Sequence, residues 1–287
     1  MTSVLRAARP ARGPATRVAG AEHPDGLVTP VVPRQRTRSK GRVLLRALGP
    51  LLLLAAWWIA SATGALSSDL LASPGQVLRA AHELWDSGQL SQALLVSLGR
   101  AGAGLLLGVT AGLVLGIAAG FTRVGEDVLD SAMQTLRALP FLSLVPLFMV
   151  WFGIGEAARI ILIAVATTFP MYVSTVGAVR NADPKLVEAA RTFGLGRWRT
   201  VGHVVLPGAL PALLSGLRLS TTLSVIALIA AEEINSLSGL GYLMAQAQNF
   251  SRTDILTVCI LIYGLLGLAA DVLIRGLERV LMPWRPR

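Results

Sequence analysis

Long stretches without charged side chains alternate with short charged segments along this chain. Residues 47–66, 101–122, 138–155, 160–179 and 255–270 contain no charged residue, and residues 204–231 contain only Arg218. A helix of about 20 apolar residues is long enough to cross the hydrocarbon core of a membrane. The pattern therefore predicts an all-α integral membrane protein. Its six expected transmembrane helices lie at about residues 43–64, 93–120, 130–152, 158–180, 208–234 and 254–276.

The composition agrees with this class of protein. Of 287 residues, 53% are hydrophobic and only 15% are charged, and the mean hydropathy is +0.63. So many apolar side chains do not fit inside the core of one soluble domain. We therefore expect a multi-pass protein of the plasma or inner membrane, with the lipid bilayer as its surroundings.

The net charge of +10 raises the alternative of a nucleic-acid partner, and the placement of the charges argues against it. Of the 26 lysine and arginine residues, 21 lie before residue 47, at 121–137, at 180–199 or after residue 274. Cytoplasmic segments of membrane proteins are enriched in these two residue types. The asymmetry predicts that both termini and the loop after the fourth span are cytoplasmic, and it explains the basicity without nucleic acid.

The N-terminal part of the chain divides into a tail and a first span. Residues 1–42 contain too few apolar side chains to form a core, so we expect a disordered basic tail. The tripeptide at 60–62, Ala-Ser-Ala, resembles a signal-peptide cleavage site. However, about forty residues precede the apolar run, and the run is long enough to span. We interpret 43–66 as a retained transmembrane helix, followed by the main transmembrane domain at 80–280.

The predicted cytoplasmic loop at 181–207 has the pattern of two short helices. Asp183-Pro184 is typical of a helix start, and Gly194 is the residue expected just beyond a helix end. A second short helix follows, and Leu206-Pro207 is predicted to end it where the chain enters the fifth span. The first helix places four apolar side chains on one face: Leu186, Ala189, Ala190 and Phe193. From the residues alone, an amphipathic connector that lies on lipid headgroups is an alternative.

This loop resembles the "EAA" loop of ABC-importer permeases. Glu188-Ala189-Ala190 is followed after three residues by Gly194 and, nine residues later, by Val204, with Leu206-Pro207 beyond it. Valine at 204 is a mild departure, because the family usually has isoleucine there. "PLFMVWFGIGEAARI", "AEEINSLSGLGYL" and "YGLLGLAADVLIRGLER" also look like permeases of the aliphatic sulfonate, taurine and nitrate group. The resemblance extends over about residues 80–287.

The resemblance implies a type I ABC-importer permease core and a set of partners. These are a second permease copy in a homodimer, two ABC ATPase subunits and an extracytoplasmic solute-binding protein. In that family the loop docks on the ATPase and couples it to the spans. Carried over to this sequence, the ATPase-coupling residues are Leu186, Glu188, Ala189, Ala190, Phe193, Gly194, Leu206 and Pro207.

The sequence indicates no enzyme chemistry, cofactor or metal site. A P-loop needs a lysine beside its glycine-rich turn, and the two lysines, Lys40 and Lys185, lack that context. ATP hydrolysis would therefore belong to another subunit. His82-Glu83 lacks the second histidine of a metalloprotease motif, and Cys259 is the only cysteine. Glycines at four-residue spacing between 104 and 120 predict close helix packing.

A few charged residues fall within or beside the predicted spans, where charge is costly and is usually paired or functional. Arg100 and the glutamates Glu232 and Glu233 lie near the same outer face, which predicts an ion pair. Arg218 lies near mid-bilayer, where it either lines the translocation pathway or pairs with a neighbour. Asp271 is expected to pair locally. We name Arg218, Arg100 and Glu232 as candidates for pathway or gating roles.

The substrate is the least constrained expectation. The resemblance favours a small anion, with aliphatic sulfonate first and taurine, nitrate or bicarbonate as alternatives. In a different class, an ATP-independent secondary transporter or a channel is the alternative, although no internal repeat is visible in the sequence.

Overall fold

The computed structural model describes residues 40–64, 67, 70–138, 140–234 and 236–283, and no strand occurs among them. The chain divides into two compact units, the first of which ends at Leu51. Helix α1 (Lys40–Ala62) begins in the first unit, and the remaining helices belong to the second. The expected tail at 1–42 lies almost wholly outside the described residues.

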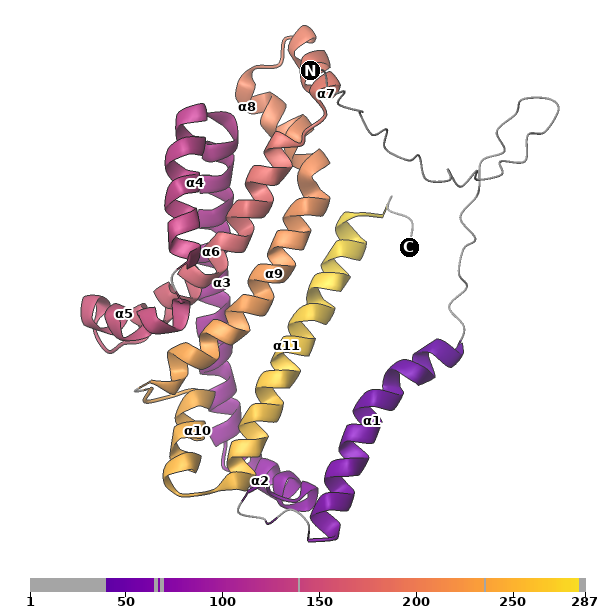
Figure 1. The fold of residues 1–287 in the computed structure, drawn as a ribbon, viewed down its shortest axis with the longest axis vertical. Helices are drawn as coiled ribbons and strands as arrows, with labels where there is room; N and C mark the ends of the chain where they lie inside the picture. The colour runs from indigo at the N-terminus through magenta and orange to yellow at the C-terminus, as the bar shows by residue number, and fades with distance from the viewer. Residues whose placement is uncertain (1–39, 65–66, 68–69, 139, 235, 284–287) are drawn as a thin grey trace, which may run out of the picture. The chain divides into compact units, whose positions relative to one another are not determined.

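Helices α3, α6 and α9 form the centre of the second unit, and α11 lies on the α9 side (Figure 1). Their bounds are Gln89–Phe121 for α3, Glu156–Arg180 for α6, Leu206–Glu233 for α9 and Thr253–Leu281 for α11. The described residues contain four helices long and apolar enough to cross a membrane: α3, α6, α9 with the turn before it, and α11. The apolar part of α1, Leu48–Ala62, is shorter. A multi-pass membrane protein follows from these helices.

A stripe of glycines brings α3 and α6 together, as the spacing predicted. A Cβ atom at Gly108 would lie 2.0 Å from the Thr167 Oγ1 atom and 2.3 Å from the Ala164 carbonyl oxygen. Only glycine leaves room for this approach. The same face of α3 meets α6 at the other glycines of the stripe: Gly104, Gly112, Gly116 and Gly120.

The predicted third span at 130–152 is wrong as a single helix. Helix α4 (Arg123–Ala138) ends before Pro140, a short 3₁₀ turn η1 (Phe141–Leu144) follows, and α5 (Val145–Phe152) has only eight residues. Proline lacks the N–H group that an α-helix needs, so Pro140 and Pro146 interrupt a run that is uncharged and apolar. In Figure 1, α4 lies beside α3 and α5 turns away from the bundle. The count of six spans is therefore not confirmed.

Short helices mark the two ends of the second unit (Figure 1). At one end, which we call the α7 end, lie α7 (Pro184–Thr192) and α8 (Arg197–Thr200). At the opposite end, which we call the α10 end, lie α2 (Pro74–Asp86) and α10 (Leu240–Asn249). Helix α10 begins two residues into the "SGLGYL" segment at 238–243.

Packing is concentrated at the α10 end. The largest group of buried apolar side chains there includes Leu228, Leu240 and Cys259, each 0% exposed. Helix α11 buries four residues between Thr257 and Tyr263 but only Ile274 in its second half. Cys259 is thus a small side chain of this core.

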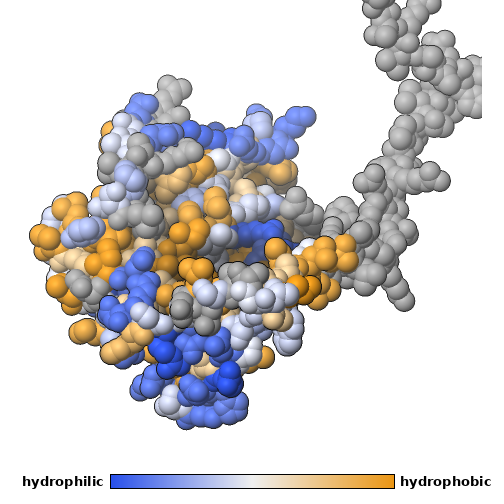
Figure 2. Space-filling model, turned by 60° about the horizontal axis from the view of Figure 1, so that its bottom comes forward, coloured by the Kyte–Doolittle hydropathy of each residue, from blue (hydrophilic) through white to orange (hydrophobic). Residues whose placement is uncertain are grey.

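Apolar side chains cover much of the outer surface. Figure 2 shows hydrophobic residues in the middle of the view, between hydrophilic residues along its top and bottom. On α11, for example, Leu265, Leu268 and Val272 are each more than 60% exposed. Such a surface suits lipid or a partner chain better than water.

Candidate functional site

The loop between α6 and α9 begins with a capped helix, α7. The Asp183 side chain accepts a hydrogen bond of 2.9 Å from the Lys185 N–H group, and Pro184 is the first helical residue. Asp183 satisfies a backbone donor that has no partner inside the helix, and proline needs none at this position. The helix start predicted from Asp183-Pro184 is confirmed.

Gly194 ends α7 in the way that its position predicted. Its φ angle is +77°, in the left-handed region that a glycine adopts without strain. The Gly194 N–H group donates to the Arg191 carbonyl at 2.9 Å, and the Leu195 N–H group donates to the Ala190 carbonyl at 3.0 Å. These two bonds form a Schellman motif, which satisfies the last carbonyls of α7 and reverses the chain.

The predicted helix break at Leu206-Pro207 is wrong. Helix α8, a π-helical turn η2 (Val201–Val205) and α9 follow one another without interruption from Arg197 to Glu233. The Leu206 N–H group donates to the Val201 carbonyl, five residues back. A proline ring clashes with the carbonyl four residues before it in a regular helix, and the wider π turn gives Pro207 room.

The side chains of α7 separate into an outward and an inward set. Leu186 is 57% exposed and Phe193 is 84% exposed, and Glu188 and Ala189 are also exposed. Ala190 is buried against the chain itself, with 6% exposure. The expectation that Ala190 shares an outward contact face with Leu186 and Phe193 is therefore wrong, because this position faces the bundle.

A cleft of about 750 Å³ lies behind α7. Glu188 and Arg191 from the loop contribute charged side chains to its wall, together with residues from the ends of α3 and α6. Beside it, Asp130 of α4 accepts hydrogen bonds from the Tyr172 hydroxyl and, at 3.1 Å, from the Arg180 guanidinium of α6. These bonds hold α4 to α6 near the α7 end.

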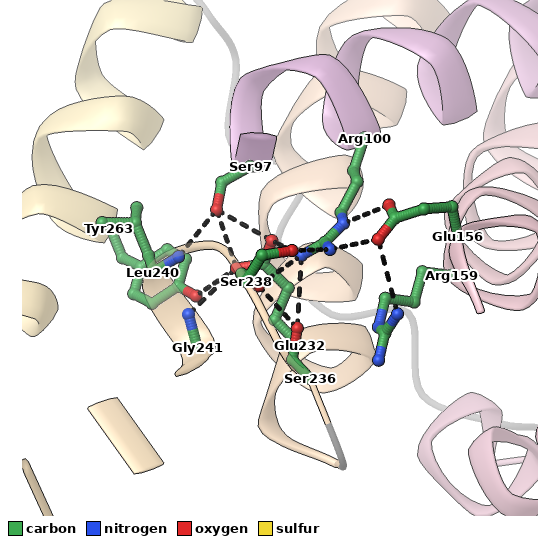
Figure 3. A network of polar contacts seen from close by, with 10 residues as sticks. All are labelled: Ser97, Arg100, Glu156, Arg159, Glu232, Ser236, Ser238, Leu240, Gly241 and Tyr263. Carbon is green, nitrogen blue, oxygen red and sulfur yellow. Dashed lines mark hydrogen bonds and ion pairs between the residues drawn. The ribbon is translucent and has the colours of Figure 1, made fainter. Parts of the chain in front are cut away.

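A buried polar network lies at the α10 end, centred on Glu232 (Figure 3). Glu232 is 0% exposed, and its carboxylate accepts from Arg100 Nη1 at 2.6 Å and from Ser97 Oγ at 2.8 Å. The Gly241 N–H group and the Tyr263 hydroxyl each donate to it at 3.0 Å. One carboxylate therefore joins α3, α9, α10 and α11.

Arg100 extends this network to α6 and to the segment before α10 (Figure 3). Its Nε atom donates to Glu156 Oε2 at 2.6 Å, and its Nη1 and Nη2 atoms donate to the carbonyl and hydroxyl oxygens of Ser238, both at 2.8 Å. Arg159 Nη1 lies 3.6 Å from Glu156 Oε1. Two arginines and two glutamates make the cluster neutral, so their charges compensate one another.

The sequence pointed to part of this network. The pairing of Arg100 with a glutamate at the end of the fifth span is seen with Glu232, while Glu233 is exposed. With exposures of 2% and 0%, Arg100 and Glu232 lie on no surface that a solute reaches in this conformation. Glu156, Ser97 and Tyr263 were not expected, because only the fold brings them to Arg100 and Glu232.

A second set of charges lies between α9 and α11. Arg218 Nε and Nη2 donate to Asp271 Oδ1 at 2.9 and 2.6 Å, and Arg275 Nη2 contacts Asp271 Oδ2. The local pairing expected for Asp271 is therefore present, and Arg218 is one of its partners. Unlike the Glu232 network, these side chains are partly exposed, at 43% for Arg218, 28% for Asp271 and 55% for Arg275.

Comparison with known proteins finds relatives for most of the chain. The model of the family described as "Binding-protein-dependent transport system inner membrane component" matches residues 108–282. A protein named as an aliphatic sulfonates transport permease, SsuC of Escherichia coli (strain K12), is 46% identical over 83% of this chain and 90% of its own length. The taurine transport system permease protein TauC of the same organism is 32% identical over 81% of this chain and 86% of its own length.

A similar fold occurs among solved structures. The membrane chain of an amino acid ABC transporter superposes with a TM-score of 0.55 over 69% of this chain and 97% of its own, at 19% sequence identity. At this identity, the likeness concerns the fold alone.

Proposed function

The chain belongs to the family of inner-membrane components of binding-protein-dependent transport systems, and we propose that it is the permease subunit of an ABC importer for small organic sulfonates. The observation that carries the proposal is the similarity to SsuC, which extends over most of both chains. The match to TauC supports taurine, itself a sulfonate, as the second candidate substrate. Membership of this family leaves the ATP-independent transporter and the channel without support.

In the proposed importer, α7 is the contact for a separate ABC ATPase subunit. Leu186 and Phe193 project from the loop as apolar side chains with no role in the described core. Because the chain is helical without interruption from Arg197 to Glu233, a displacement of the loop would be transmitted along α9. The loop therefore has both an outward contact face and a stiff connection to the spans.

The proposal also sets the orientation and the other partners. The α7 end faces the cytoplasm, as do both termini, and the α10 end faces a solute-binding protein outside the membrane. Two copies of the chain enclose the pathway. ATP binding brings the ATPase subunits and the two loops together, the spans open outward to receive the anion, and hydrolysis restores the inward-facing state.

Uptake by cells tests the substrate. A strain that lacks this permease is grown on ethanesulfonate, taurine, nitrate or sulfate, and uptake of each labelled anion is compared with and without the restored chain. We expect restoration for ethanesulfonate, and restoration for nitrate alone would contradict the sulfonate proposal.

Copurification of the ATPase tests the loop contact. Glu188→Lys reverses an exposed charge on α7 and is expected to abolish both ATPase copurification and uptake. Glu233→Lys reverses an exposed charge at the α10 end and serves as the matched control, with ATPase copurification retained. If α7 only rests on lipid headgroups, Glu188→Lys will copurify with the ATPase as the unmodified chain does.

A further inference from the structure

We propose that Arg218, Asp271 and Arg275 form an anion-exchange site. In it, a sulfonate monoanion replaces Asp271 as the ion-pair partner of Arg218 and thereby releases α11 from α9. The identity of the anion rests on the proposed function. The exchange itself rests on the contacts, the depth and the exposure of these three side chains.

The three residues form a cluster with one uncompensated positive charge. Arg218 from α9 and Arg275 from α11 both bind the single carboxylate of Asp271. The Glu232 network, in contrast, balances two arginines against two glutamates. A monoanion that binds Arg218 would make the cluster neutral, while Asp271 keeps Arg275 as its partner.

The cluster lies at the depth of the hydrocarbon core. Arg218 is twelve residues from the start of α9 and Asp271 is ten residues from the end of α11, which corresponds to about 18 and 15 Å from the α7 end of each helix. A hydrocarbon core of about 30 Å, centred on helices of about 42 Å, begins about 6 Å from that end. A partly exposed charged cluster at this depth is costly against lipid, so we place it on a water-filled pathway.

The neighbouring positions on both helices are polar or small. Ser215 and Thr222, three residues before and four residues after Arg218, share its face of α9 and are exposed. Gly264 and Gly267, seven and four residues before Asp271, share its face of α11. A Cβ atom at either glycine would meet no described atom within 4 Å. The positions beside the charges on α9 and α11 are therefore polar or lack a side chain, and no described atom crowds the two glycines.

The packing of α11 explains why exchange at this site would move the helix. Its first half buries four residues and is joined to Glu232 through the Tyr263 hydroxyl. Its second half buries only Ile274, and the Arg218–Asp271 bond joins this half to α9. Loss of that bond would leave α11 attached at the α10 end and free to separate from α9 at the α7 end.

Guanidinium chemistry suits a sulfonate. Arg218 uses two nitrogens on one carboxylate oxygen, and a sulfonate offers three oxygens that accept such charge-assisted bonds. A sulfonate also stays ionised at any pH at which the protein is folded. The site thus recognises the charged head that all small organic sulfonates share and ignores the organic group.

Cross-linking between α9 and α11 tests the exchange. Cys259→Ala removes the only cysteine, and Thr222→Cys with Gly267→Cys then places one thiol on each helix. These positions lie at one level, because the helices are antiparallel and Arg218 meets Asp271. The full chain in lipid nanodiscs is treated with a bifunctional thiosulfonate, with and without ethanesulfonate. We expect ethanesulfonate to lower the cross-linking yield severalfold, and choline chloride to leave it unchanged.

Two variants decide whether Arg218 is responsible. In Arg218→Gln, the yield should be low from the start and insensitive to ethanesulfonate, whereas the surface variant Arg79→Gln should respond as the unmodified chain does. Asp271→Asn removes the same ion pair from the other side, so it tests the role of the pair if Arg218→Gln does not accumulate. A yield that ethanesulfonate leaves unchanged, or lowers equally in these variants, would overturn the proposal.

These outcomes remain separate from the proposed function. ATPase copurification reports whether the chain is an ABC permease, and the cross-linking assay reports anion exchange whether or not an ATPase is present. If copurification and ethanesulfonate uptake succeed while cross-linking is insensitive to ethanesulfonate, the anion site alone is refuted. In cells, Arg218→Gln with Asp271→Asn, which keeps polar side chains on both helices, should lose ethanesulfonate uptake at least about tenfold.

Discussion

The Glu232 carboxylate has no contact with solvent, yet Ser97, Arg100, Gly241 and Tyr263 all donate hydrogen bonds to it. A buried ion pair contributes little net stability compared with an apolar replacement, but removal of one partner costs about 3–5 kcal/mol. The benefit of the network is therefore geometric. It permits one arrangement of α3, α9, α10 and α11 and penalises others.

Gly108 shows how strongly a single residue controls helix packing. Gly108→Val should lower the stability of the folded chain by about 1–3 kcal/mol, the usual cost of overpacking, because its Cβ would lie 2.0 Å from Thr167 Oγ1. The measurement is the midpoint of thermal unfolding in detergent, followed by size-exclusion chromatography.

Gly102→Ala is the control for Gly108→Val. Gly102 lies on the same helix and is exposed, and a Cβ atom there meets no described atom within 4 Å. Its unfolding midpoint should stay close to that of the unmodified chain. Equal midpoints for Gly108→Val and the unmodified chain would show that α3 and α6 do not meet as described.

At the scale of elements, α7 and its connection to α9 combine a tight turn with a stiff helix. The turn depends on the positive φ of Gly194, and the connection depends on a π turn that accommodates Pro207. Neither feature disturbs the spans themselves. A change in the turn should therefore alter the direction of α7 and leave the insertion of the spans intact.

Gly194→Val tests this separation. A β-branched side chain is strained at a φ of +77°, at a cost of at least about 1 kcal/mol. We expect normal amounts of protein in the membrane but loss of ATPase copurification and of ethanesulfonate uptake. Gly196→Ala, at an exposed glycine without a positive φ, should keep both. Retention of both activities in Gly194→Val would show that the turn does not set the ATPase contact.

Elements were predictable where apolar length alone defines them. The uncharged runs predicted α3, α6, α9 and α11, and Asp183-Pro184 and Gly194 predicted the bounds of α7. The prediction of one span over 130–152 was wrong because hydropathy does not register that Pro140 and Pro146 lack the N–H groups that a continuous helix needs. The helix break predicted at Pro207 was wrong for the opposite reason, because the helix continues there. A π turn, which no local sequence pattern predicts, relieves the clash of the proline ring. The partners of Glu232 come from three other helices, so no local pattern of the sequence could bring them together.

At the scale of the whole second unit, packing is uneven along the bundle axis. The α10 end holds the largest apolar core and the Glu232 network. Towards the α7 end, α11 buries little and is bound to α9 through Arg218 and Asp271. Regions with fewer buried contacts open at lower free energy. We therefore expect conformational change to be concentrated at the α7 end, on the side where the proposed ATPase acts.

The N-terminal tail should be dispensable for transport. Its composition cannot bury a core, and the helix of the first span begins at Lys40. Deletion of residues 2–39 should leave membrane insertion and ethanesulfonate uptake at the level of the full chain, measured at equal protein amounts. Loss of uptake with normal insertion would assign the tail a role in transport.

The ion pairs of Arg100 have a consequence for biosynthesis. Glu156 follows Arg100 by 56 residues, whereas Glu232 follows it by 132. At about 5–20 residues per second, the ribosome makes Glu232 roughly 7–26 s after Arg100. During that interval a cationic side chain would sit in a newly inserted helix without its final counter-ion. Glu156, which is made first, can neutralise Arg100 in the meantime. The order of the two glutamates along the chain thus gives the nascent helix one counter-ion before the second reaches the membrane.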